Sequence, residues 1–216
     1  MKNLMLLAVQ GAGKGTVAKK LSEKYGYVHI STGDILRERA SVGDEVGNEI
    51  KNMIDNGIFV PNETMFEAIE YKITRPECAN GFILDGFPRN IEQAKGYDEL
   101  LKKLNMDLGL VINLTIPEEQ LTQRIIGRRL CKGCGAIYNI YFDEIAPKKE
   151  GVCDKCGGEL YQRDDDNLEA MKTRVETYYK VTAPIIDHYK EQNALYEVDS
   201  TNTDEACVEI GKLISN

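Results

Sequence analysis

The sequence lacks any long apolar run and any excess of positive charge. No stretch approaches the roughly 20 consecutive apolar residues of a membrane-spanning helix, so we expect no insertion into a membrane. The first nine residues hold a short apolar run, but glycines follow too early for a signal peptide, and we interpret it as a buried strand. The formal net charge is −8, which argues against nucleic acid or an anionic membrane as the main partner. Any phosphate-binding site must therefore depend on a local group of positive charges and not on the charge of the whole protein.

Internal repeats and low-complexity tracts are also missing, and there are only two histidines, His29 and His188. A solitary histidine is more often structural than catalytic, so we expect neither to carry the chemistry. Six cysteines are present, four of them in two close pairs. That pattern is typical of metal ligands in a reducing compartment rather than of a disulfide framework, and it favours a cytoplasmic location. Cys78 and Cys207 stand apart, and we expect them to be small buried thiols.

The remaining composition is that of a soluble globular protein, with 42% apolar and 29% charged residues in 216. This length fits one core domain carrying an insertion. Most of its five short apolar runs are continuous, as in strands that are covered on both faces. We therefore expect an α/β fold with a five-stranded parallel sheet and helices on both faces. The runs are Leu4–Val9, Tyr27–Ile30, Phe82–Leu84, Leu108–Leu114 and Leu195–Val198.

Two stretches interrupt the alternation of strands and helices. Residues 32–61 place two helical patterns between neighbouring strands, and residues 128–164 are rich in glycine, cysteine and charge. We expect both to lie over the carboxyl edge of the sheet, where ligands of open α/β sheets bind. Residues 1–31, 62–127 and 165–216 would then form the core domain.

A glycine-rich loop follows the first expected strand and leads directly into a helix. It reads Gly11, Ala12, Gly13, Lys14, Gly15, Thr16. In such a loop backbone N–H groups surround a phosphate, Lys14 reaches the β and γ phosphates, and Thr16 holds Mg²⁺. The strict phosphate-loop pattern fails twice, because Ala8 replaces its first glycine and Gly15 separates Lys14 from the hydroxyl. The loop alone thus leaves a plain glycine-rich turn as an alternative.

The Gly-Lys-Gly-Thr ending of this loop is similar to the nucleoside monophosphate kinase family, and three further segments share the resemblance. They are residues 31–37 (STGDILR), residues 81–89 (GFILDGFPR) with Gln93, and residues 163–166 (RDDD) with Arg174. The segments span nearly the whole chain, and Asp-Gly-Phe-Pro-Arg is highly specific. With its cysteine-containing insertion, the sequence resembles the long-lid bacterial adenylate kinases.

The resemblance implies reversible phosphoryl transfer from Mg-ATP to AMP, giving two ADP. It makes residues 32–61 the nucleoside monophosphate-binding insertion and residues 128–164 a lid whose closure excludes water. We expect ATP, AMP, ADP and Mg²⁺ as ligands, and a monomer with no nucleic-acid partner.

Phosphoryl transfer leaves the protein mainly alignment and charge stabilisation, which favours arginine because its guanidinium grips phosphate oxygens bidentately. The resemblance places Arg37 and Arg89 on the AMP phosphate, and Arg124, Arg128, Arg163 and Arg174 around the transferring group. Further AMP contacts are expected from Thr32, Ile58, Phe59, Val60, Gly86, Phe87, Pro88 and Gln93, with Arg163 and Arg174. Further ATP contacts are expected from Arg128, Ile137, Tyr138 and Asn202.

The choice of base at the acceptor site depends chiefly on Thr32 and Gln93. In the related pyrimidine monophosphate kinases the position of Thr32 usually holds a smaller residue, so its hydroxyl favours adenine. Asp85 ends a buried strand, where an unpaired carboxylate is costly, and we expect it to hold Mg²⁺ through water. A helix-capping role is the alternative for Asp85.

Two cysteine pairs in the second insertion have the spacing of a metal site. Cys131 and Cys134 are followed after 18 residues by Cys153 and Cys156. This spacing is typical of a tetrahedral four-cysteine zinc site, and four thiolates leave no open position, so the Zn²⁺ would be structural. A segment so small and polar buries little apolar surface, and the metal would supply most of its order.

Two other functions remain open from the sequence. A kinase of the same fold could act on UMP or CMP. A zinc ribbon could instead bind nucleic acid through the lysines near the cysteines, Lys132, Lys148, Lys149 and Lys155. The second alternative leaves residues 85–89 without a purpose.

Overall fold

The computed structural model describes residues 2–9, 11–55, 60–162 and 166–215, without the side chains of residues 33, 34, 54, 55, 170, 174 and 177. The strands are β1 Leu4–Ala8, β2 Val28–Ser31, β3 Phe82–Asp85, β4 Leu110–Thr115, β5 Arg128–Cys131, β6 Ile137–Asn139, β7 Leu160–Tyr161 and β8 Leu195–Asp199. The α-helices are α1 Lys14–Tyr25, α2 Thr32–Ser41, α3 Glu45–Asp55, α4 Asn62–Ile73, α5 Ile91–Lys103, α6 Glu118–Ile126, α7 Leu168–Glu191 and α8 Thr203–Ser215. Two short 3₁₀ turns, Pro76–Cys78 and Asp143–Ile145, complete the described elements.

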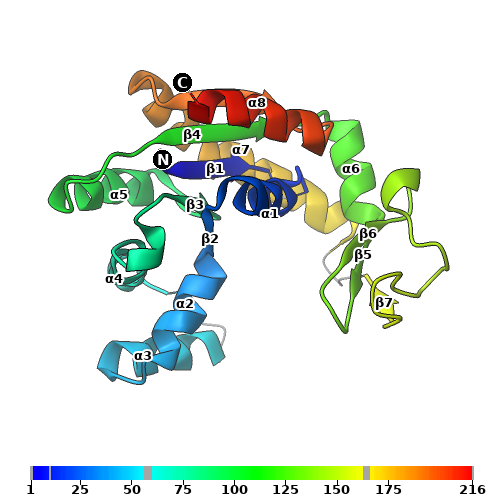
Figure 1. Cartoon of the computed structure of the whole chain (residues 1–216), viewed down its shortest axis with the longest axis horizontal. Coiled ribbons are helices and arrows are strands. Elements are labelled where there is room, and N and C mark those ends of the chain that lie inside the picture. The colour runs from blue at the N-terminus through cyan, green and yellow to red at the C-terminus, as the bar shows by residue number, and fades with distance from the viewer. Residues whose placement is uncertain (1, 10, 56–59, 163–165, 216) are drawn as a thin grey trace.

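A five-stranded sheet forms the centre of the molecule, in the order β2-β3-β1-β4-β8. All four strand pairings in it are parallel. The expected five-stranded parallel sheet is confirmed, and each expected strand differs from the observed one by at most two residues at either end. In Figure 1 the arrow of β4 points toward α6, so the carboxyl edge of the sheet faces the side where the chain enters its second insertion.

Helices cover both faces of this sheet because side chains alternate along each strand. In β1, Leu4 and Leu6 pack in one buried cluster with residues of α1 and α8. Met5 and Leu7 point the other way, into a cluster with residues of α4, α5 and α7. The five residues of β1 are all buried, which explains why the strand reads as a continuous apolar run.

The burial and the end of helix α1 follow from its sequence. Val17, Ala18 and Leu21 are fully buried, as their shared face predicts. The helix begins at Lys14, two residues before Thr16, and ends at Tyr25. Gly26 follows in the left-handed conformation, with φ 76°, which glycine adopts without a Cβ penalty.

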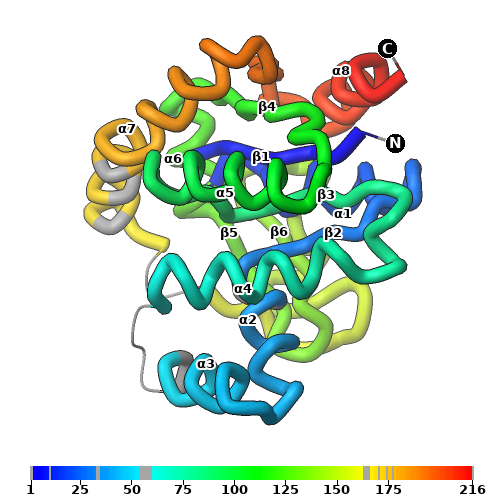
Figure 2. The backbone as a smooth tube through the Cα atoms, turned by 90° about the vertical axis from the view of Figure 1, so that its left-hand side faces the viewer, coloured from blue at the N-terminus to red at the C-terminus, as the bar shows by residue number. Residues whose placement is uncertain are grey.

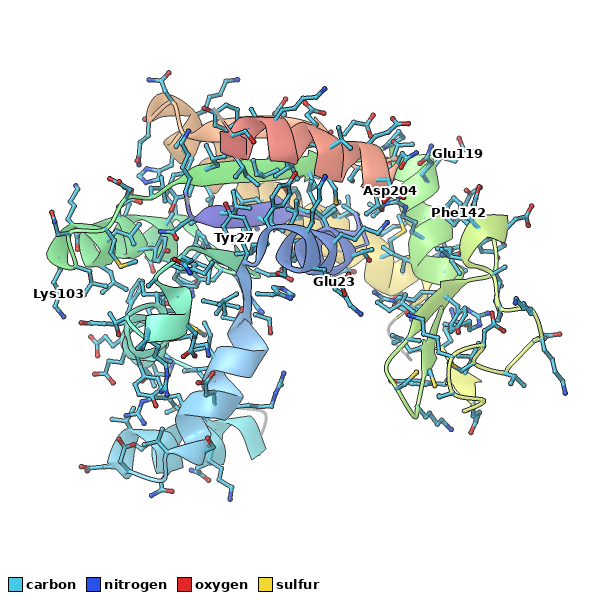
Figure 3. The ribbon with its side chains drawn as sticks, viewed as in Figure 1. Glu23, Tyr27, Lys103, Glu119, Phe142 and Asp204 are labelled. Carbon is cyan, nitrogen blue, oxygen red and sulfur yellow. The ribbon has the colours of Figure 1, made fainter. Side chains whose placement is uncertain are left out.

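Two segments extend from the same side of the core (Figures 1 and 2). Helices α2 and α3 form one of them, and a second, antiparallel sheet in the order β6-β5-β7 forms the other. In Figure 3 the labelled Phe142 lies on the side of the small sheet, far from Lys103 at the end of α5. Among the described residues, none of the helices is both long and apolar enough to cross a membrane.

Candidate active site and metal centre

The glycine-rich loop joins β1 to α1 and has the backbone that its glycines allow. Gly11 and Gly13 have φ values of 97° and 88°, where other residues are strained. A Cβ on Gly13 would lie 3.3 Å from Nη1 of Arg124, so the Arg124 guanidinium lies against the loop. Lys14 is the first residue of α1, and Thr16 is exposed in its first turn. The backbone N–H groups at the start of α1, which have no partner within the helix itself, thus lie beside a lysine, and this arrangement favours an anion.

Asp85 lies at the end of β3, next to the loop, and has two cationic or hydrogen-bonding neighbours. Its Oδ1 is 3.4 Å from Nζ of Lys14, and its Oδ2 is 3.1 Å from Nε2 of His29 on β2. Burial alone would raise the pKa of Asp85, but the hydrogen bond to His29 and the charge of Lys14 outweigh it and hold the pKa below its usual value. Lys14 and His29 therefore supply partners for this carboxylate within the protein. Its contact with Mg²⁺ remains a prediction.

Thr32 is the point where the first insertion meets the core strand. It is buried, and its Oγ1 donates to the backbone oxygens of Gly86, at 3.0 Å, and Asp85, at 3.3 Å. Gly86 has φ 82°, and a Cβ there would lie 2.8 Å from the Thr32 hydroxyl. The glycine is therefore required both by its backbone and by the approach of Thr32.

Gln93 links the two segments expected around the acceptor base. Its Oε1 accepts from the backbone N–H of Arg89 at 2.8 Å, and its Nε2 donates to Oδ1 of Asn62 at 2.9 Å. Nε of Arg89 donates to the oxygen of Gly86 at 3.0 Å. Gln93 is buried, so its amide positions the Arg89 backbone against the start of α4 in this structure.

Arg124 contacts the two residues that precede Asn202, at the other side of the loop. Nη2 of Arg124 donates to the backbone oxygens of Ser200, at 2.9 Å, and Thr201, at 2.6 Å. Oδ1 of Asn202 accepts from the N–H groups of Asp204 and Glu205, which caps the start of α8. The structure thus brings Arg124 to the phosphate loop and gives Asn202 a capping role.

Arg128 lies at the start of β5, where the chain enters the small sheet. Its guanidinium forms a two-pronged ion pair with Asp166, whose side chain is fully buried. The Nε–Oδ2 distance is 2.9 Å. Gln162 donates to the backbone oxygens of Asp166 and Ile126, so three segments are joined at this point.

The remaining expected site residues are distributed as follows. Arg37 is exposed on α2, and Val60 is buried. Ala12 is buried within the loop, and Phe87 and Pro88 are buried after the end of β3. Gly15 is exposed. Three expected residues, Ile58, Phe59 and Arg163, lie outside the described residues, as does the side chain of Arg174. None of these roles is decided by the structure.

The four paired cysteines converge within the small sheet and its turns. Their Sγ atoms all lie within 4.8 Å of one another, with Cys131 and Cys156 at 3.4 Å and Cys134 and Cys153 at 3.6 Å. Tetrahedral zinc with bonds of about 2.3 Å requires sulfur atoms about 3.8 Å apart, so the donor set fits a metal. The surroundings of Cys153 lower its pKa to about 6, and the largest cause is the hydrogen bond with Tyr138. The N–H of Cys134 likewise lowers the pKa of Cys131.

The two residues expected over ATP on the lid differ sharply in environment. Ile137 is 56% exposed, whereas Tyr138 is 7% exposed and packs with Cys131, Cys153 and Leu160. The Tyr138 side chain therefore belongs to the interior of the small sheet in this structure. Of these two residues, Ile137 is the one that exposes an apolar side chain.

Two residues of this site were not predicted from the sequence. His29 was given no part in the chemistry, and it contacts Asp85. Asp166 was given no role, and it holds Arg128. The pairing of β2 with β3, which places His29 near Asp85, is not visible in either strand alone. The run of three aspartates at 164–166 was the available signal for an arginine partner.

A parallel sheet, a glycine-rich loop with a lysine at its carboxyl edge and an arginine against that loop are typical of phosphotransferases of the nucleotide kinase class. The adenylate kinase family model matches residues 6–194. An adenylate kinase of Archaeoglobus fulgidus is 48% identical over 199 residues, covering 92% of this chain and 91% of its own. Adenylate kinases of Thermodesulfovibrio yellowstonii and Caldicellulosiruptor bescii are each 46% identical, over 93% and 89% of this chain and 92% and 88% of their own. The chain belongs to the adenylate kinase family.

Proposed function

We propose that this protein transfers the terminal phosphoryl group of Mg-ATP to AMP, with ATP at the glycine-rich loop and AMP between α2 and residues 85–93. One observation carries the proposal. Asp85 lies 3.4 Å from Lys14 of the loop, and the oxygens of Asp85 and Gly86 both accept from Thr32 of the first insertion. The proposed donor and acceptor segments therefore meet within two residues, as direct transfer between two nucleotides requires.

The charged residues take the roles that their positions favour. Lys14 and Arg124 lie at the loop and would stabilise negative charge on the phosphoryl group in transit. Thr16 and Asp85 would hold Mg²⁺, Asp85 through water, and the ion would neutralise phosphate charge. Arg37 and Arg89 would bind the acceptor phosphate, and Arg128, Arg163 and Arg174 would join the transferring group.

The domain division follows from the same proposal. Residues 32–61 would bind AMP, residues 128–164 would close over ATP and exclude water, and the other segments would form the core. Arg128 bridges the second insertion and Asp166. Closure would have to bring this guanidinium to the phosphates, either with Asp166 or away from it. We further propose that the chain acts as a monomer.

We propose a structural Zn²⁺ at Cys131, Cys134, Cys153 and Cys156. The convergent sulfur atoms support it, and four thiolates leave no position for a substrate. Metal analysis of anaerobically purified protein should find about one zinc per chain. Protein purified in this way without bound metal would contradict the proposal.

An assay of ADP formation from Mg-ATP tests the function directly. AMP, UMP and CMP are each supplied as acceptor, and we expect AMP to give the highest kcat/KM. A higher kcat/KM for UMP or CMP would replace the proposal by a pyrimidine nucleotide kinase of the same fold. Salt-sensitive binding to DNA or RNA without ADP formation would instead favour the zinc-ribbon alternative.

A further inference from the structure

Tyr138 connects the interior of the small sheet to the cysteine cluster. Its hydroxyl oxygen lies 3.4 Å from Sγ of Cys153. The side chain is 7% exposed and shares a buried cluster with Cys131, Cys153 and Leu160. The other described members of this cluster are the proposed ligands Cys131 and Cys153, the aliphatic Leu160 and the partly buried Ala136, so Tyr138 is its only aromatic residue among those described.

The direction of the Tyr138 hydrogen bond follows from a second contact. The backbone N–H of Asp154 donates to the Tyr138 hydroxyl oxygen at 2.8 Å. A tyrosine hydroxyl has one proton, and since the oxygen already accepts from Asp154, that proton is left to be donated. Sγ of Cys153 lies within hydrogen-bond distance of the hydroxyl, and as a metal-bound thiolate it would carry negative charge and accept well.

We propose that Tyr138 is a positioning residue for the lid metal, which it retains by donating a hydrogen bond to the Cys153 thiolate. The proposal depends on the proposed zinc site. Outer hydrogen bonds fix the orientation of a ligand and reduce the charge on its sulfur. Tyr138 would make this hydrogen bond from β6. Asp154, whose backbone N–H donates to the Tyr138 hydroxyl, directly follows the proposed ligand Cys153 in the sequence. A single hydroxyl thereby ties the strand to the turn that carries Cys153.

The test compares Tyr138→Phe with Tyr161→Phe, a matched removal of a hydroxyl from strand β7 of the same sheet. Tyr161 is 38% exposed. Zn²⁺ affinity is measured on the full chain by competition with a chromophoric chelator. We expect Tyr138→Phe to weaken Zn²⁺ binding by about tenfold or more, as for other outer-shell changes, and Tyr161→Phe to stay within about twofold of the parent.

Replacement of zinc by Co²⁺ separates a hydrogen bond from mere packing. A thiolate that loses a hydrogen bond is easier to oxidise, so the sulfur-to-cobalt charge-transfer band of Tyr138→Phe should move to lower energy. Unchanged affinity would overturn the proposal, and so would weaker binding with an unmoved band, which would show that the ring only packs. A parent chain that binds no Zn²⁺ would overturn the metal site itself, and a parent that binds Zn²⁺ confines any failure to Tyr138.

Discussion

The central sheet and the small sheet of the lid are ordered by different means. In the core, both faces of β1 are buried in large clusters that include helices far apart in the sequence. In the small sheet, the buried cluster consists of Cys131, Tyr138, Cys153 and Leu160 among the described residues. Half of that cluster is thiol. Hydrophobic burial accounts for the first region, whereas we expect the second to depend on its proposed metal.

The core and the lid have different proposed roles in the same chain. The core must hold the phosphate loop, Asp85 and Thr32 in a fixed relation, and a large apolar core gives that rigidity. On the proposed function the lid would close as a unit while remaining ordered, and the proposed metal would supply that order within the lid itself. Changes in the core should therefore alter turnover, and changes at the metal should first alter local order.

The largest expected effect comes from the core. Lys14→Ala should lower kcat by at least about a hundredfold, because it removes a charge that stabilises the transferring phosphoryl group. The measurement is steady-state ADP formation with saturating Mg-ATP and AMP. Metal content should not change, since Lys14 lies outside the lid.

Lys19→Ala is the matched control for Lys14→Ala. Lys19 lies on the same helix with its side chain 69% exposed, 3.9 Å from Glu23. An exposed pair of this kind contributes little, so kcat should remain within about twofold of the parent. If Lys14→Ala also stays within about threefold, Lys14 has no part in the mechanism.

Removal of the proposed metal should produce the next largest effect, and this effect should be confined to the lid. After chelation, amide hydrogen exchange in residues 128–162 should accelerate by tens of fold or more, because local opening then loses its main opposing interaction. The strands of the central sheet should retain their protection. Equal loss of protection in both regions would show that the lid and the core are one cooperative unit.

The two regions also differ in how far the sequence predicts them. Continuous apolar runs predicted all five core strands to within two residues, because burial on both faces leaves a direct mark on composition. The cysteine spacing predicted the convergence of Cys131, Cys134, Cys153 and Cys156. It did not predict that Tyr138 lies inside the lid, since a three-residue strand carries too little periodicity to assign its faces.

The contacts of Asp85 show a second limit. Its place at the end of β3 was predictable from the sequence. Its contact with His29 depends on the pairing of β2 with β3, and the sequence of a single strand does not show which strand lies beside it. Arg128 and Asp166 are 38 residues apart in sequence, and their ion pair requires the small sheet to fold back on the start of α7. Such long-range pairs are products of the tertiary fold rather than of local pattern.

A smaller effect is expected where the first insertion meets the core. Thr32→Ala removes the hydroxyl that donates to Gly86, and one hydrogen bond is worth about 0.5–1.5 kcal/mol, so the preference for AMP over CMP should fall by up to about tenfold. The KM for ATP should barely change. The ratio of kcat/KM for the two acceptors is the measurement.

Thr32→Ser is the control for Thr32→Ala because it retains the hydroxyl and loses only a methyl group. Its ratio of specificity constants should remain near that of the parent. A fixed ratio in both variants would show that the base is recognised elsewhere, and an equal fall in both would assign the selectivity to the methyl group.

The smallest effect is expected at Ala8, where the chain departs from the usual phosphate-loop glycine. Glycine is needed only if the backbone adopts a positive φ or if a Cβ would crowd the phosphate. Among the described residues, the non-glycine positions with positive φ are Asn105 and Asn193, so Ala8 has no such strain. Ala8 instead ends β1, is 9% exposed and pairs with Leu114.

Gln10 is a further departure: the resemblance to the nucleoside monophosphate kinases implies proline at this position, which lies outside the described residues. Proline there would mainly stiffen the loop, and such a gain is about 0.4–1 kcal/mol. Glycine at position 8 would offset part of it, since glycine within a strand costs about 0.5–1 kcal/mol relative to alanine. Ala8→Gly with Gln10→Pro should therefore raise kcat/KM for ATP by less than about tenfold, and the parent should be an active kinase. An inactive parent whose turnover the double variant restores would show that the loop requires glycine at position 8 in its working conformation, despite the extended backbone of Ala8.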